Sequence, residues 1–443
     1  CATNAHARGG TPYHAGPAIE TLPMHSTALD QADPLSRFRE RFHIPRHGEG
    51  ELAYFVGNSL GLQSKDAEAA VLGELAVWRE RAVEGHFKGE RPWLRYLESM
   101  TAPLAELVGA QPIEVAAMNT LTVNLHLLMV SFYRPTPERP AILIEAGAFP
   151  SDWQAVESQI RFHGFDPADC LIEVQPDEPG GTISMAEIAR AIEQHGPRLA
   201  LVLWPGIQYR TGQAFDLKEI ARLAKAQGAA VGFDCAHAAG NLPLALHDTG
   251  ADFATWCHYK YVNAGPGAVS GIFVHERHAH DSTLPRLTGW YGHKLATRFQ
   301  MASSFDPTPG AEGWVMSNPP ILALAPVRAS LELFREAGGM AALRERSLRL
   351  TGYLESLIES ELSNVLEVLT PKQPERRGAQ LSLRVRGGRA QGRALFEYLA
   401  AHGVLGDWRE PDVIRISPAP LYNRFAEIRR FADTVLAWSA SQG

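Results

Sequence analysis

The chain has 443 residues, of which 45% are hydrophobic and 21% are charged, the composition of a globular protein with room for two or three domains. Its formal net charge of −7, with both signs interleaved, argues against a nucleic-acid binder. No apolar run approaches the roughly 18 residues that a membrane helix needs, so we expect neither a nucleic-acid nor a membrane partner.

Cysteine and histidine spacing gives no sign of a disulfide framework or a metal site. The 17 histidines contain no HExxH pattern, and none of the four cysteines belongs to a CxxC pair. We therefore expect no metal and a reducing, cytoplasmic location. The cysteines are Cys1, Cys170, Cys235 and Cys257.

The first 45 residues differ in character from the rest. Residues 1–23 are polar, contain glycine and proline, and lack the apolar core of a secretory signal. We expect residues 1–23 to be disordered and residues 1–45 to form an N-terminal tail and arm.

From residue 141 onward, apolar runs alternate with amphipathic segments. Continuous apolar strands separated by helices indicate a mostly parallel sheet that is buried on both faces. Ligands bind such sheets at the carboxyl ends of the strands, so the residues that follow each strand are the candidates for function. The predicted strands are 141–147, 170–176, 199–206, 229–237, 252–258 and 268–276, and the predicted helices are 151–164, 184–196 and 216–228.

After residue 310 the pattern changes to two long helices followed by a shorter alternation. This predicts a smaller C-terminal α/β domain over 311–443, after a large domain over 46–310. The predicted helices here are 319–338, 340–362, 391–403 and 424–441, and the strands are 380–386 and 412–418.

Two charged residues lie at neighbouring strand ends. Asp234 ends one apolar run, with His237 three residues later, and Lys260 follows the next run in an aromatic stretch. Lysine forms a Schiff base with the aldehyde of pyridoxal 5′-phosphate, and a carboxylate keeps the pyridine nitrogen of that cofactor protonated. The pair therefore favours this cofactor. Taken singly, Lys260 could be a salt-bridged or snorkelling lysine, and Asp234 a helix cap or turn residue.

Two predicted helix starts are candidates for the phosphate of such a cofactor. Thr120 and Thr122 precede one apolar helical run, and Phe149, Ser151 and Asp152 begin another helix. A helix start offers free N–H groups and a favourable dipole to an anion, although plain N-capping explains the same residues. An isolated phenylalanine such as Phe149 could stack on the cofactor, but the core is the more common place for it.

Arg415 interrupts the apolar strand 412–418. A buried arginine requires a carboxylate or phosphate partner. Two interpretations are equally open: a clamp for the α-carboxylate of a substrate, or an internal ion pair.

The chain resembles the kynureninases, pyridoxal-phosphate hydrolases of the aspartate aminotransferase-like fold (fold type I). The resemblance runs from about residue 50 to the end of the chain. The motifs that carry it are YFVGNSLGLQ (54–63), MNTLTVNLHLLM (118–129), EAGAFPSDWQAVESQ (145–159), GFDCAHAAGNLPLALHD (232–248), WCHYKYVNAGPG (256–267), GWYGH (289–293), MSNPPIL (316–322) and IRISPAPLYN (414–423).

The resemblance implies hydrolytic Cβ–Cγ cleavage of L-kynurenine or 3-hydroxy-L-kynurenine to L-alanine and anthranilate or 3-hydroxyanthranilate, in tryptophan catabolism or NAD biosynthesis. Lys260 would be the Schiff-base lysine and Asp234 the partner of the pyridinium nitrogen. Tyr259 would bind the phosphate and help in proton transfer. Further cofactor contacts would come from Leu121, Thr122, Phe149, Pro150, Ser151, Asp152 and His237.

The resemblance also implies a homodimer with the site at its interface. Trp290 and Asn318 would reach the cofactor from the partner subunit. Arg415 would hold the substrate carboxylate, and Ser59, His86 and Asn318 would lie near its aromatic end.

One departure from the family pattern concerns the phosphate. Some relatives have a serine where this chain has Pro205. Because proline supplies no side-chain donor, that contact must be absent or replaced.

Three alternatives to a kynureninase remain open at this point. Another fold type I enzyme, an aminotransferase or a cysteine desulfurase, is the nearest. A desulfurase needs a cysteine on a mobile loop, whereas Cys170, Cys235 and Cys257 lie in or beside predicted strands. A non-catalytic binding protein of the same fold is the second. A nucleotide-binding α/β protein is the third, although no GxGxxG or GxxxxGK[ST] pattern follows any strand.

Overall fold

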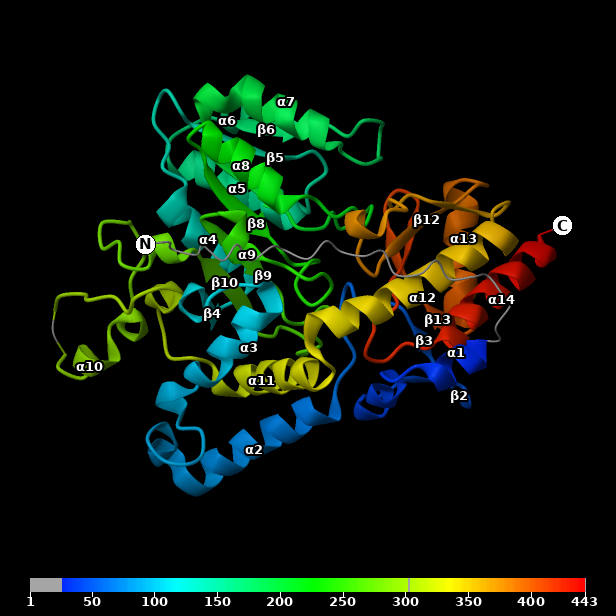
Figure 1. The fold of residues 1–443 in the computed structure, drawn as a ribbon, viewed down its shortest axis with the longest axis horizontal. Helices are drawn as coiled ribbons and strands as arrows, with labels where there is room; N and C mark the ends of the chain where they lie inside the picture. Colours follow the sequence, from blue (N-terminus) through cyan, green and yellow to red (C-terminus); the bar gives the residue numbers. More distant parts are fainter. Residues whose placement is uncertain (1–25, 302, 443) are drawn as a thin grey trace, which may run out of the picture.

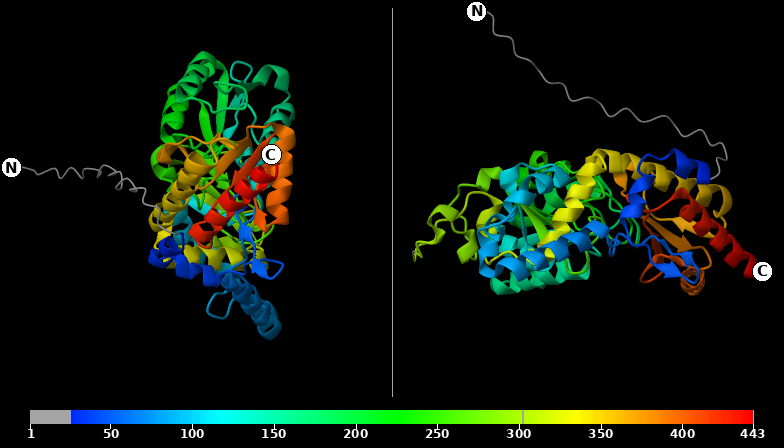
Figure 2. Two further views of the ribbon diagram at one scale, coloured as in Figure 1. Left: turned by 90° about the vertical axis from the view of Figure 1, so that its right-hand side faces the viewer. Right: turned by 90° about the horizontal axis from the view of Figure 1, so that it is seen from below.

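The computed structural model describes residues 26–301 and 303–442, so the disorder expected for residues 1–23 lies outside the described residues. Two lobes lie at opposite ends of an elongated molecule, each built on its own sheet (Figure 2). We call them the large lobe, around a seven-stranded sheet, and the small lobe, around a four-stranded sheet. Helix α12 runs from one lobe toward the other (Figure 1).

The sheet of the large lobe has the order β4-β10-β9-β8-β7-β5-β6. Only β10 runs against its two neighbours, and the other six strands share one direction, so the expected mostly parallel sheet is confirmed. The strands are β4 (Val115–Met118), β5 (Ala141–Glu145), β6 (Leu171–Val174), β7 (Leu199–Pro205), β8 (Ala230–Asp234), β9 (Phe253–Trp256) and β10 (Ser270–Val274).

Apolar residues explain why this sheet is central. Every residue of β4, β5, β9 and β10 is buried, as expected where helices cover both faces. The helices of this lobe are α2 (Lys65–Arg81), α3 (Glu98–Val108), α4 (Leu121–Phe132), α5 (Pro150–Phe162), α6 (Pro167–Cys170), α7 (Met185–His195), α8 (Leu217–Ala226), α9 (Leu246–Thr249), α10 (Leu295–Arg298) and α11 (Ile321–Glu336).

Local signals set several helix starts. Ser184 caps α7 by accepting a hydrogen bond from the N–H of Glu187, and Asp216 caps α8 in the same way from Glu219. None of the described helices has the length and apolar character required to cross a bilayer.

The small lobe holds an antiparallel sheet of order β11-β12-β15-β14. Its strands are β11 (Leu366–Val368), β12 (Leu381–Val385), β14 (Asp407–Arg409) and β15 (Val413–Ile416). Its helices are α1 (Ser26–Ala32), α12 (Gly339–Glu361), α13 (Arg389–Ala401) and α14 (Phe425–Ser441).

An N-terminal segment belongs to the small lobe. Strand β3 (Ala53–Tyr54) pairs in parallel with β13 (Val404–Leu405), and Ala53 and Phe55 are buried in the apolar core of that lobe. The expected domain limits at residues 46 and 310 stay predictions, but this pairing shows that the chain enters the small lobe before it builds the large one.

Candidate active site

A pocket lies at the carboxyl ends of β5, β7, β8 and β9, the edge of the sheet where the sequence predicts chemistry. Most of the predicted cofactor residues meet there. The pocket is lined by Leu121, Thr122, Glu145, Phe149, Ser151, Asp152, Pro205, Ile207, Tyr209, Asp234, Ala236, His237, Cys257, Tyr259 and Lys260.

The amine of Lys260 lies close to three other residues of this pocket. Its Nζ is 2.9 Å from Nε2 of His237, and 5.9 Å from the ring centroids of both Phe149 and Tyr259. Lys260 follows β9 and His237 follows β8, so adjacent parallel strands bring the two side chains together.

His237 is buried, and the pKa of its imidazole lies well below the usual range because of that burial and the nearby positive charge of Lys260. The ring is therefore neutral at pH 7. Its Nδ1 has no hydrogen-bond partner among the described residues, which is unusual for a buried polar atom.

Three carboxyl groups line the same pocket, those of Glu145, Asp152 and Asp234. Asp234 accepts a hydrogen bond from the N–H of Ala236 at 2.6 Å, so the turn interpretation is confirmed for one of its oxygens. Burial beside Asp234 raises the pKa of both Asp152 and Glu145 well above their usual range. One oxygen on each of these two, Oδ1 of Asp152 and Oε2 of Glu145, has no partner among the described residues.

A hydrogen bond between two side-chain hydroxyls links the first turns of α4 and α5 at the pocket. Oγ1 of Thr122, on the first turn of α4, lies 2.6 Å from Oγ of Ser151 on the first turn of α5. Thr120 occupies the N-cap position of α4 without a side-chain cap, so plain capping does not explain it. Pro150 is the first residue of α5, where its missing N–H costs nothing.

Phe149 is 42% exposed, so the expectation that it lies in the core is wrong. The ring lines the pocket, with its centroid 5.3 Å from that of Tyr209 in an edge-to-face arrangement. The open pocket beside it leaves this large apolar side chain accessible.

Tyr259 lines the pocket beside Lys260, and burial raises the pKa of its phenol. Its carbonyl oxygen accepts a hydrogen bond from the N–H of Gly61 at 2.9 Å. A Cβ at Gly61 would lie 2.5 Å from the carbonyl oxygen of Lys260 and 2.2 Å from Oδ1 of Asn263. The backbone around Gly61 therefore rests directly on the Lys260 segment.

Arg415 is 1% exposed at the centre of the small-lobe sheet. It forms an ion pair with Asp407, and its Nη1 donates to the carbonyl oxygen of Tyr209 at 2.7 Å. With its amide oxygen turned toward the guanidinium, Asn58 accepts from Nε and Nη2 at 3.1 and 3.2 Å. The ion-pair interpretation is confirmed, and the carboxylate clamp stays a prediction.

Three predicted residues lie in a second pocket. His86, Trp290 and Asn318 line it, and no residue is common to the linings of the two pockets. The ring of His86 packs edge-to-face on Trp93, and Trp290 is 42% exposed. Their arrival from a partner subunit stays a prediction. Ser59 is half-buried and lines neither pocket.

Sequence reasoning missed Glu145 and Tyr209, which line the pocket, and Gln208, which contacts Glu145. Nε2 of Gln208 donates to Oε1 of Glu145 at 3.4 Å. A charged residue at the end of an otherwise apolar strand was the available signal for Glu145, as a charged residue inside an apolar strand was for Arg415. Tyr209 and Gln208 lie on a loop whose folding back toward the pocket has no local signal.

Comparison with known proteins finds similarity to kynureninases. A family model described as "Kynureninase C-terminal domain" matches residues 343–435. The kynureninase of Stenotrophomonas maltophilia (strain K279a) is 66% identical over 94% of this chain and 98% of that relative. The kynureninase of Xanthomonas euvesicatoria pv. vesicatoria (strain 85-10) is 67% identical over the same shares.

Solved structures share the fold at low identity. A lysine-to-alanine mutant of C-DES, with glycine covalently linked to its PLP cofactor, has a TM-score of 0.73 at 19% identity and covers 89% of this chain and 99% of its own. The cysteine desulfurase CsdA of Escherichia coli has a TM-score of 0.73 at 14% identity over 91% of this chain and 98% of its own. The expected fold type I architecture is confirmed.

Proposed function

The chain belongs to the kynureninase family of pyridoxal-phosphate hydrolases, and on that premise we propose that it cleaves the Cβ–Cγ bond of L-kynurenine or 3-hydroxy-L-kynurenine. The products would be L-alanine and anthranilate or 3-hydroxyanthranilate. One observation carries the site assignment: the amine of Lys260 and the carboxyl of Asp234 converge at adjacent strand ends in one pocket.

The residues of the pocket fit the cofactor. Buried polar atoms without partners are rare in proteins, yet Nδ1 of His237, Oδ1 of Asp152 and Oε2 of Glu145 all lack one among the described residues. A polar ring placed beside them would satisfy them. When bound, pyridoxal phosphate supplies an aldehyde for covalent attachment to a lysine and a protonated ring that accepts an electron pair from the substrate.

Each group in the pocket has a place in the proposal. Asp234 would accept the hydrogen bond of the pyridinium N–H, and Asp152, held protonated by burial, would donate a hydrogen bond to the Asp234 carboxylate. Nζ of Lys260 would attach the cofactor, then remove the α-proton of the substrate. His237, neutral and 2.9 Å away, would orient that amine.

The phosphate would lie at the start of α4. The dipole and first N–H groups of this helix favour an anion, and the hydroxyls of Thr122 and Ser151 are adjacent. Pro205, the last residue of β7, has no side-chain donor for the phosphate. We propose that the hydroxyls of Thr122, Ser151 and Tyr259 supply the missing hydrogen bond.

Substrate would be held at the small-lobe side. Four hydrogen bonds to Asp407, Tyr209 and Asn58 fix the five-donor guanidinium of Arg415 in one orientation. This orientation would present a remaining N–H to the α-carboxylate of the substrate. A water molecule would add to the γ-carbonyl, and the break of the Cβ–Cγ bond would release the aromatic product first.

We also propose a homodimer. Apolar side chains gather on α2 and the segment that follows it, where Leu72, Trp78, Val83 and Phe87 are 58%, 59%, 67% and 55% exposed. Exposed apolar groups of this size mark contact surfaces. Trp290 and Asn318 would complete the active site of the partner across that contact.

A desulfurase-like reaction has less support. Cys170, Cys235 and Cys257 are all buried, and burial raises the pKa of each thiol, so none is a reactive thiolate. Buried, unpaired thiols also fit the cytoplasmic location that we propose.

The test is a fluorescence assay for anthranilate, with purified protein, added pyridoxal phosphate and L-kynurenine. We expect anthranilate and L-alanine in equal amounts. If protein that carries the cofactor, seen by its visible absorbance, forms no product from L-kynurenine or 3-hydroxy-L-kynurenine, the proposed substrate class is wrong.

A further inference from the structure

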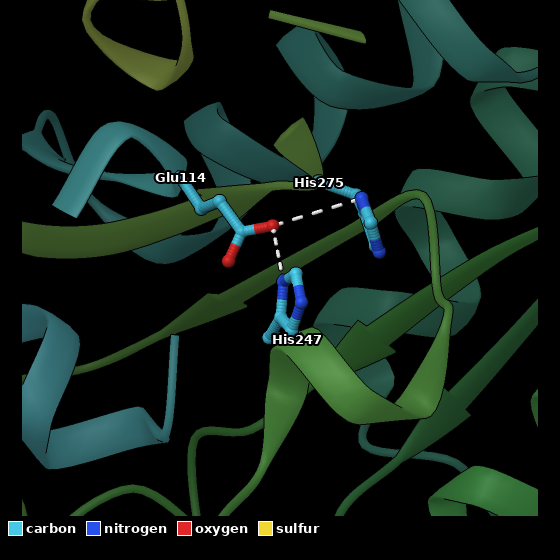
Figure 3. A group of neighbouring side chains, drawn as sticks. All are labelled: Glu114, His247 and His275. Carbon is cyan, nitrogen blue, oxygen red and sulfur yellow. Dashed lines mark hydrogen bonds and ion pairs between the residues drawn. The ribbon is translucent and has the colours of Figure 1, made fainter. Parts of the chain in front are cut away.

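A second cluster of ionisable side chains lies outside the candidate active site, where three separate segments meet. Glu114 ends the short 3-10 helix η4 (Pro112–Glu114), His247 lies on α9, and His275 directly follows β10. The three side chains point toward one another across this junction (Figure 3). None of them lines either pocket.

The spacing of the donor atoms matches a metal ion. Oε1 of Glu114 lies 3.0 Å from Nδ1 of His247 and 3.6 Å from Nδ1 of His275, and the three ligand atoms lie within 4.8 Å of one another. Two ligands bound to one tetrahedral zinc ion at about 2.0–2.1 Å are roughly 3.3 Å apart. The two distances from Glu114 bracket that value, so small side-chain movements bring all three atoms onto one ion.

The carboxylate of Glu114 is already fixed in place. It is fully buried, its Oε2 accepts from the N–H of Gln111 at 2.8 Å, and its Oε1 accepts from the N–H of Glu276 at 2.8 Å. Such supporting hydrogen bonds orient the ligands of a metal site. A carboxylate that is buried opposite two imidazoles is a preformed acceptor for a cation.

Both imidazoles have their Nδ1 atom near Oε1 of Glu114. Nδ1 of His275 accepts from the N–H of Arg277 at 3.2 Å, so this nitrogen is unprotonated, and a metal ion would take the place of this hydrogen bond. Nε2 of His247 lies 3.3 Å from the side-chain amide of Gln111. The nitrogen of that amide donates to Nε2, so Nδ1–H of His247 donates to Oε1 of Glu114 at 3.0 Å, and binding of a metal ion would release this proton.

The backbone fixes the distance between the ligand-bearing segments. Gly109 ends α3 with a φ of +61°, and its carbonyl oxygen accepts from the N–H of His247 at 3.1 Å. A Cβ at Gly109 would lie only 2.1 Å from the carbonyl oxygen of Leu244. Glycine therefore lets α9 lie directly against the segment that leads to Glu114. The His247 side chain is 31% exposed, which leaves a path for an ion to enter.

We propose that Glu114, His247 and His275 form a site for a divalent transition-metal ion, with zinc the best match and water as the fourth ligand. Two imidazoles and one carboxylate suit zinc, whereas magnesium and calcium prefer oxygen ligands alone. The ion would fasten α9 and the end of β10 to the segment before β4. Its role is structural, because none of its ligands reaches the candidate active site.

Zinc content and thermal stability of the holoenzyme test this site. After treatment with EDTA and removal of the chelator, we expect one equivalent of Zn²⁺ to rebind per chain at this site and to raise the unfolding temperature, and we expect Mg²⁺ to do neither. His247→Gln and His275→Gln should each weaken zinc binding by more than about 100-fold, the upper range for loss of an outer-shell partner. Both should keep the activity of the parent protein.

His280→Gln is the matched control, because His280 is exposed and lies five residues from His275 outside the cluster. It should bind zinc like the parent protein. Cys1, His6, His14 and His25 also offer zinc ligands, so the decisive quantity is the difference between the cluster variants and this control. Equal zinc binding by all four proteins, or none by the parent, overturns the proposal.

A spectroscopic measurement keeps the test valid if a histidine variant fails to fold. Co²⁺ in the parent protein should give the intense visible absorption of tetrahedral cobalt, and added Zn²⁺ should remove it. Weak absorption of the octahedral type rules out the proposed geometry.

Discussion

Replacement of Arg415 by lysine separates the two roles of this side chain. Lysine keeps a positive charge beside Asp407 but cannot reproduce the fork that donates to Asn58 and to the carbonyl oxygen of Tyr209. If Arg415 holds the α-carboxylate of the substrate, the variant should bind substrate weakly while it still turns over.

The structure sets the expected size of the effect. A hydrogen bond to a charged group contributes about 1.5–3 kcal/mol, so loss of one such contact to the carboxylate corresponds to a roughly 10- to 150-fold rise in KM. Loss of the contacts to Asn58 and Tyr209 should lower the free energy of unfolding by about 3 kcal/mol in addition. Both effects follow from the same substitution, so KM alone cannot distinguish them.

Two competitive inhibitors distinguish them. One is a substrate analogue with its α-carboxylate, and the other is the same molecule without it. A clamp predicts that Arg415→Lys raises the inhibition constant of the carboxylated analogue by about 10- to 150-fold and leaves the other within about twofold. Equal weakening of both inhibitors would refute the clamp and leave Arg415 with only its ion pair to Asp407.

The remaining predictions concern the amine of Lys260, the backbone contact at Gly61 and the buried imidazole of His258. Lys260→Ala should abolish anthranilate formation and leave the unfolding temperature nearly unchanged; near-full activity would remove Lys260 from the mechanism. Gly61→Ala should lower stability by about 1–3 kcal/mol and reduce kcat, because its Cβ would meet the carbonyl oxygen of Lys260 at 2.5 Å. Gly352→Ala, where a Cβ meets nothing within 4 Å inside α12, is the control and should stabilise the protein by up to about 1 kcal/mol; a similar loss of activity in both variants would argue against the contact. Burial lowers the pKa of His258 to about 4, so the unfolded chain binds a proton there between about pH 6.5 and 4 that the folded protein does not. Stability should therefore fall by about 3 kcal/mol as the pH drops through that window, and urea unfolding of His258→Gln should show a shallower pH dependence than the parent; an unchanged slope would contradict this.

The elements that the sequence predicted are those whose signal is local. An apolar run between turn residues predicted β5, β7 and β8 within two or three residues of their observed bounds. Helix α2 went unpredicted because its apolar residues Leu72 and Trp78 face outward instead of forming a buried stripe. Strands β11 and β14 are too short for an alternating pattern and depend on their neighbours in the sheet.

The residues of the candidate site also divide into those with a local sequence signal and those without one. Lys260, Asp234 and His237 were predictable because strand ends in a parallel sheet meet at one edge. The ion pair of Arg415 with Asp407 was one of two open interpretations, since a sequence shows a buried charge but not its partner. The exposure of Phe149 and the grouping of His86 with Trp290 and Asn318 in a second pocket depend on packing between distant segments, for which no local pattern exists.

The early entry of the chain into the small lobe has a mechanical consequence. The backbone from β3 to Gly61 is anchored at one end by its pairing with β13 and at the other by the hydrogen bond from Gly61 to Tyr259, the neighbour of Lys260. A bridge from Val56 to Ser417, whose hydroxyl lies 3.1 Å from that of Tyr261, adds a third anchor. A rotation of the small lobe relative to the large lobe would pull on the chain on both sides of Lys260. Closure of the lobes around a substrate and a shift in the position of the Lys260 amine would then be one motion.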